Sequence, residues 1–122
     1  MNKKPILIVA GEPYSIFSEI FFKILKKFNL KRPIVLIASK RIFEKQMKRL
    51  GYKYHYEEID KNLSKKINNK RKVINIIDIK FNFKKTFDKI TDRSNNYINE
   101  CFFTANKLLK DKKAYALING PI

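Results

Sequence analysis

Short apolar runs divide the chain at regular intervals. Residues 5–10, 33–38, 73–79 and 114–118 are almost wholly apolar, and Gly, Pro or polar residues bound them. Runs of this length that are rich in β-branched residues are typical of buried strands. Residues 52–57 alternate aromatic and other side chains, which predicts a short edge strand.

Between these runs, apolar residues recur at three- and four-residue spacing, which predicts amphipathic helices over 16–28, 39–50 and 95–110. Ser15 and Ser39 are N-cap candidates, and Gly51 is placed to end the second helix. The predicted inward residues of the first helix are Ile16, Phe17, Ile20, Phe21, Ile24, Leu25 and Phe28. Those of the second are Ile42, Phe43, Gln46, Met47 and Leu50, and those of the third are Tyr97, Ile98, Cys101, Phe102, Ala105, Leu108 and Leu109. Phe22 and Phe103 fall outside these faces.

Buried strands that alternate with helices predict an α/β fold, a three-layer α/β/α arrangement with a mostly parallel sheet. Residues 1–122 form one domain in this interpretation, with a polar loop at 60–72 and an ambiguous segment at 81–93. Ligands of such sheets bind beyond the carboxyl ends of the strands. Two turns follow predicted strands there, and they supply the candidate site residues: Gly11, Glu12, Pro13, Asn119, Gly120 and Pro121.

The net charge of +17 raises the question of a nucleic-acid partner. Lys, Asn, Ile, Phe and Tyr are all abundant together, a pattern typical of AT-rich coding, so compositional drift is favoured over selected polyanion binding. We therefore expect no specific nucleic-acid partner, only weak and salt-dependent binding. No apolar run approaches the roughly 20 residues that span a membrane. A cytoplasmic protein without membrane contact is expected.

Individual residues offer little catalytic chemistry. His55 is the sole histidine and is expected to be an ordinary surface side chain, so no metal site and no catalytic residue are predicted. Cys101 lies on an apolar helix face, which favours a packed thiol over a nucleophile. Glu12 either orients a ligand or accepts hydrogen bonds from its own turn, the latter being favoured. Glu57, Glu58 and Asp60 are explained by a solvated strand end.

The two turns also carry a family resemblance. Residues 6–20 (ILIVAGEPYSIFSEI) resemble the opening of the 4-hydroxythreonine-4-phosphate dehydrogenase family, an apolar strand followed by Gly-Glu/Asp-Pro-Ala-Gly-Ile-Gly-Pro-Glu. Residues 115–122 (YALINGPI) resemble its later strand, which runs into Thr-Gly-Pro-Ile/Val and then a lysine. The order and spacing of the two motifs agree with the family. The resemblance covers the whole chain but only a little over a third of a typical member.

The resemblance implies an incomplete fold of the isocitrate/isopropylmalate dehydrogenase-like class. It also implies an enzyme of vitamin B6 synthesis that oxidises and then decarboxylates 4-phosphooxy-threonine. NAD and a divalent metal held by three histidines are its implied cofactors, and a homodimer is the implied assembly. All three histidines and the NAD contacts would lie beyond Ile122. The implied partner is therefore the remainder of the dehydrogenase chain, and this chain alone is expected to hold no cofactor, to be inactive and to be marginally stable.

The two motifs depart from the family pattern at several positions. Ser15 and Phe17 replace the two loop glycines, Ser18 replaces a proline, and Asn119 replaces a threonine. A phenylalanine in place of a glycine either changes the loop or closes the space beside it. Two alternatives stay open: a small basic α/β module with nonspecific polyanion affinity, and an unrelated nucleotide-binding protein. The absence of a glycine-rich phosphate loop disfavours the second.

Overall fold

A central parallel sheet organises the protein in the computed structural model, which describes residues 3–27, 31–65, 67–68 and 73–120. Its strands are β1 (Ile6–Val9), β2 (Ile34–Ala38), β3 (His55–Glu58), β4 (Val73–Asp78) and β5 (Ala116–Asn119). Their order across the sheet is β3-β4-β2-β1-β5, and every pairing is parallel. The predicted fold class is therefore confirmed, with each predicted strand found within a few residues of its expected place.

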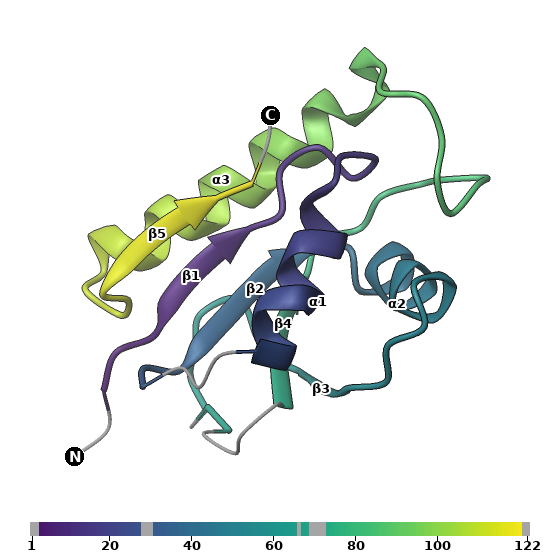
Figure 1. Cartoon of the computed structure of the whole chain (residues 1–122). Coiled ribbons are helices and arrows are strands. Elements are labelled where there is room, and N and C mark those ends of the chain that lie inside the picture. Colours follow the sequence, from purple (N-terminus) through teal and green to yellow (C-terminus); the bar gives the residue numbers. More distant parts are fainter. Residues whose placement is uncertain (1–2, 28–30, 66, 69–72, 121–122) are drawn as a thin grey trace.

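Helices cover both faces of the sheet (Figure 1). One side carries α1 (Phe17–Lys27) and α2 (Lys40–Arg49), and the other carries α3 (Asn95–Lys110), which follows a short 3-10 turn at Asp92–Ser94. The connection between two parallel strands forms a right-handed crossover. The connecting helix therefore lies on one face of the sheet when the next strand is added on one side, and on the opposite face when the next strand is added on the other side. The chain adds strands away from β1 on one side and then returns with β5 on its other side, which places α3 opposite α1.

Two clusters of buried side chains fill the spaces on either side of the sheet. Beneath α3 lie Leu7, Val9, Val35, Ile37 and Ile77 of the sheet with Tyr97, Ile98, Cys101, Ala105 and Leu108 of the helix. Beneath α1 and α2 lie Leu36, Ile74, Ile76, Phe21, Phe22, Leu25, Phe43 and Met47. The predicted inward faces of α2 and α3 are confirmed, apart from half-buried Leu50, Phe102 and Leu109, and Phe103 is exposed as expected.

The predicted inward face of the first helix is partly wrong. Phe22, expected outside the apolar stripe, is 0% exposed, whereas Ile16, Ile20 and Ile24 are 62, 43 and 42% exposed. Phe22 contacts the rings of Phe43, Tyr52 and Tyr54 at centroid distances of 4.9 to 6.0 Å, and Phe21 at 5.8 Å. These aromatic neighbours come from α2 and the segment before β3, and they rotate α1 toward themselves. Phe28 lies outside the described residues.

The expected cap of α2 is confirmed at Ser39, whereas Ser15 lies two residues before the first residue of α1. Ser15 Oγ accepts a hydrogen bond from the Phe17 amide at 3.2 Å, and Ser39 Oγ accepts one from the Ile42 amide at 3.4 Å. Gly51 follows α2 with φ of +82°, a left-handed conformation that glycine adopts without steric cost. Among the described residues, no helix is long and apolar enough to cross a membrane.

Candidate functional site

The two motif turns meet at the carboxyl ends of β1 and β5. These strands are neighbours in register, with Val9 opposite Asn119. After β1 the chain crosses to β2 on one side of β1, and it later returns to form β5 on the other side of β1. The direction of strand addition therefore reverses between β1 and β5. Ligands of open α/β sheets bind in the crevice outside such a point. The sequence motifs therefore coincide with the position where this topology places a ligand.

Backbone contacts hold the two turns together. The Gly120 amide donates to the Val9 carbonyl at 2.8 Å, and Gly11 has φ of +78° as the chain leaves β1. A Cβ on Gly120 would lie 2.4 Å from the Ala10 carbonyl oxygen and 2.6 Å from the Phe17 ring. Glycine is required at position 120 because both neighbours approach too closely for any side chain. Pro121 lies outside the described residues.

Phe17 closes the space between the turns. This residue stands where the resembled family has a glycine, and its ring packs directly against Gly120. The remaining cavity under the first turn measures about 10 Å³, which is room for about one water molecule. Of the two shapes that the sequence left open for this loop, the structure has the closed one. The cavity enclosed by the described residues under this turn is therefore too small for a substrate.

The side chain of Glu12 is buried at the carboxyl edge of the sheet and does not face solvent. Its side chain is only 4% exposed, and Oε2 accepts a hydrogen bond from Ser94 Oγ at 2.6 Å. Its Oε1 accepts one from the Tyr14 amide at 3.3 Å. The bond within its own turn agrees with the favoured structural role. Ser94 is 82 positions away, and no local pattern in the sequence could have identified it as the partner.

Two further side chains of the edge connect the strands to the helices. The Tyr97 hydroxyl accepts a hydrogen bond from the Ser39 amide at 2.7 Å, and Gln46 Nε2 donates to the Pro13 carbonyl at 2.8 Å. Burial raises the pKa of the Tyr97 hydroxyl well above its usual value, so it stays neutral. Asp78, at the end of β4, accepts from the Lys40 amide at 2.9 Å. A carboxylate near the end of a predicted buried strand was the sequence signal that could have identified Asp78.

The remaining candidates behave as ordinary structural residues. Cys101 is fully buried, and burial raises the pKa of its thiol to about 12, so the reactive thiolate is disfavoured. Asn119 is exposed, and its amide donates to the Gly120 carbonyl at 2.9 Å. Asp60 accepts a hydrogen bond from the Ser64 hydroxyl at 2.8 Å and further ones from the Ser64 and Asn62 amides, and these bonds lower the pKa of its carboxyl.

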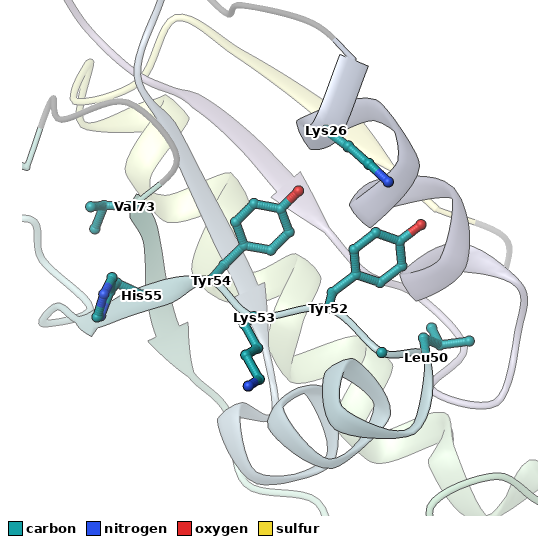
Figure 2. Close-up of a pocket in the computed structure, with 8 residues that line it drawn as sticks. Lys26, Leu50, Tyr52, Lys53, Tyr54, His55 and Val73 are labelled. Atoms are coloured by element: carbon teal, nitrogen blue, oxygen red, sulfur yellow. The ribbon is translucent and has the colours of Figure 1, made fainter.

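A separate groove lies at the opposite end of the sheet, where β3 and β4 begin (Figure 2). It encloses about 660 Å³ and is lined by Lys26, Leu50, Gly51, Tyr52, Lys53, Tyr54, His55 and Val73. Figure 2 shows the rings of Tyr52 and Tyr54 side by side, with both hydroxyls directed toward Lys26. Their planes differ by 16°. Parallel sheets bind ligands at their carboxyl edge, so this groove is at the wrong end for such a site.

The described residues do not form a metal centre. His55 is exposed at the start of β3, and no group of three His, Cys, Asp or Glu side chains in the described part of the chain could hold an ion. A metal with several protein ligands at about 2.0–2.2 Å therefore does not fit this part of the protein.

Described lysines and arginines occur on all three helices and in the loops between them, which is the spread expected from compositional bias.

Comparison with solved structures identifies the fold. A 4-hydroxythreonine-4-phosphate dehydrogenase from Burkholderia phymatum matches 98% of this chain and 37% of its own, with a TM-score of 0.82 and 17% identity. A putative enzyme of the same name from Salmonella typhimurium gives 0.79 at 20% identity, covering 98% and 38% of the two chains. One from Klebsiella pneumoniae gives 0.71 at 19%, covering 98% and 37%.

The chain has the fold of these dehydrogenases. The resemblance inferred from the two motifs is thereby confirmed for the fold, including its isocitrate/isopropylmalate dehydrogenase-like class. The chain spans about 37–38% of the length of the matched structures. No protein-family profile and no curated protein sequence matches it.

Proposed function

We propose that this chain is the amino-terminal part of an NAD-dependent, metal-assisted dehydrogenase that resembles 4-hydroxythreonine-4-phosphate dehydrogenase. The observation that carries the proposal is the meeting of the two motif turns, Gly11–Pro13 and Asn119–Gly120, at the reversal point of a sheet with that fold. The two turns are 106 positions apart, from Pro13 to Asn119, so their meeting is a tertiary property that motif similarity by itself does not guarantee.

In this proposal, the chain supplies a scaffold rather than the reacting groups. Its carboxyl edge is built from peptide groups, a buried Glu12 and the exposed amide of Asn119. The described residues include no converging acid and base at this edge. The remaining polypeptide binds NAD and the divalent metal, which together support oxidation of 4-phosphooxy-threonine and the decarboxylation that follows. Phe17 narrows the crevice, so ligand contacts at this edge differ from those of enzymes that have glycine there.

The DNA that follows the codon for Ile122 is the first test. We expect the reading frame to continue through a lysine within a few residues and then through three widely spaced histidines. The second test measures NADH formation from 4-phosphooxy-threonine, NAD and a divalent metal. Residues 1–122 alone are expected to give no NADH above background, and the chain joined to its continuation is expected to give turnover. A stop codon after Ile122, or a complete chain without turnover, would contradict the proposal.

A further inference from the structure

The groove at the amino ends of β3 and β4 is built around two neighbouring tyrosine rings. Tyr52 and Tyr54 both pack against the cluster of buried side chains beneath α1 and α2. Their ring centroids are 6.2 Å apart, and their planes differ by only 16°. Figure 2 shows the two rings side by side, with their hydroxyls pointing the same way. The two rings therefore form one nearly flat aromatic surface.

Phe22 supports this aromatic surface from the core. Its plane differs by 21° from that of Tyr52 and by 6° from that of Tyr54, at centroid distances of 5.2 and 6.0 Å. Because Phe22 is 0% exposed, the tyrosine rings stack on a side chain that is itself fixed in the core. Both tyrosines are half-buried and line the groove, so the surface that Phe22 does not cover borders the groove. Aromatic rings held in this way are a stacking surface for nucleobases.

Two lysines flank the rings without an acidic neighbour. Lys26 and Lys53 line the groove, and none of the described residues that line it is Asp or Glu. Neither lysine forms an ion pair with another described residue. Figure 2 shows Lys26 beside the tyrosine hydroxyls and Lys53 at the other end of the rings, next to the chain backbone. Positive charges at both ends of an aromatic surface match a ligand that combines flat rings with phosphates.

The remaining properties of the groove also fit nucleotides. Its volume of about 660 Å³ lies within the roughly 300–1,000 Å³ of small-molecule sites. Burial, together with the nearby Tyr52, raises the pKa of the Tyr54 hydroxyl, which therefore stays protonated and can donate to a phosphate oxygen. The groove lies at the amino end of the sheet, so it is separate from the crevice at the carboxyl ends of β1 and β5.

We propose that this groove binds single-stranded nucleic acid, with successive bases on Tyr52 and Tyr54 and the adjoining phosphates on Lys26 and Lys53. Such stacking does not select a sequence, because every base has a flat face. The net charge of +17 attracts the strand from a distance, and the tyrosine rings add a contact that salt does not screen. A duplex is disfavoured because its bases are stacked on one another and cannot reach the rings.

The experiment uses the full-length product of the gene, which carries the groove whether or not the reading frame continues past Ile122. Fluorescence anisotropy measures its binding to a labelled oligothymidylate of about twelve nucleotides at about 0.2 M salt. Oligothymidylate has no adenine and so does not imitate NAD. Tyr52→Leu and Tyr54→Leu remove a ring but keep an apolar side chain over Phe22, whereas Tyr54→Phe keeps the ring.

The charges are tested separately from the rings. Lys26→Gln and Lys53→Gln each remove one flanking charge. The matched controls lie on exposed positions of α3, outside the groove: Phe103→Leu for the rings and Lys107→Gln for the charges. Circular dichroism and urea unfolding establish that each variant is folded. Ultraviolet cross-linking of the unmodified protein to the oligothymidylate, followed by peptide mapping, locates the strand without any substitution.

We expect the dissociation constant to rise about fivefold or more for each tyrosine-to-leucine variant and less than about twofold for Tyr54→Phe and Phe103→Leu. Each groove lysine variant should lower the slope of log affinity against log salt by about 0.7 and weaken binding more than Lys107→Gln does. Cross-links should map to Tyr52 or Tyr54.

Four results would overturn the inference: no binding of the oligothymidylate, equal effects of groove and control variants, cross-links confined to other peptides, or tighter binding of a duplex of the same length. Thymidine monophosphate is titrated in parallel. If it bound as tightly as the oligothymidylate, the ligand would be a free nucleotide, and the assignment to a strand would be wrong.

Discussion

Replacing Phe22 with alanine tests the orientation of α1 directly. The hydrophobic pattern places Ile20 and Ile24 inward and Phe22 outward, whereas the structure has Phe22 fully buried and both isoleucines more than two-fifths exposed. The pattern and the structure therefore rank the cost of alanine substitutions at these positions in opposite order.

The expected loss of stability follows from the contacts that each substitution removes. The Phe22 ring packs against the rings of Phe21, Phe43, Tyr52 and Tyr54. Truncating a buried phenylalanine costs about 3–5 kcal/mol, and the four aromatic contacts favour the upper part of that range. A half-exposed isoleucine loses about half of the roughly 2 kcal/mol that full burial contributes, so Ile20→Ala and Ile24→Ala should each cost about 1 kcal/mol or less.

Urea unfolding followed by far-UV circular dichroism measures these differences, with equal m-values required for the comparison. A loss of about 4 kcal/mol is a large fraction of the stability of a small domain, so Phe22→Ala can leave too little folded protein for a measurable unfolding transition. Phe22→Leu, expected to cost about half as much, then supplies a measurable midpoint. A smaller loss for either Phe22 variant than for Ile20→Ala would refute the orientation of α1 described above.

Further outcomes follow from the carboxyl edge and the α3 core. Ser94→Ala removes the 2.6 Å hydrogen bond to buried Glu12 and should cost about 1–3 kcal/mol in urea unfolding. Ser18→Ala removes a buried hydroxyl that has no hydrogen-bond partner among the described residues, so it should be neutral or stabilising. Gly120→Ala should cost about 1–3 kcal/mol in the same assay, because its Cβ meets a backbone carbonyl that cannot move away; an unchanged midpoint would contradict the close packing of the two turns. Cys101 should react with a thiol reagent at pH 8.5 only at the rate of global unfolding, and rapid labelling of the folded protein would contradict its burial. The folded state holds the pKa of this thiol at about 12, against an ordinary value of 9.0, so the free energy of unfolding should fall as pH rises above 9, and Cys101→Ala should reduce that fall.

The local sequence pattern was sufficient to predict the buried face of an element wherever that element has a single apolar face. In α3, the apolar residues other than Phe103 gather on the side that carries Tyr97, Cys101 and Leu108, so periodicity alone identified its buried face and the packed thiol. The runs that form β1, β2 and β4 were equally clear, because continuous runs rich in β-branched residues are typical of buried strands. The two turns were recognisable because Gly11 and Gly120 follow such strands directly.

Tertiary structure decided the rest. Apolar residues occupy more than half of the circumference of α1, so the spacing of its apolar residues is compatible with several orientations of the helix. The aromatic rings of α2 and of residues 52–54 favour the orientation that buries Phe22. The pairing of Glu12 with Ser94 joins residues 82 positions apart, and no local signal specifies it. The order of the strands was also undetermined by the sequence. After β4 the chain returns through a right-handed crossover and forms β5 on the side of β1 opposite to β2. That placement brought the two motif turns together.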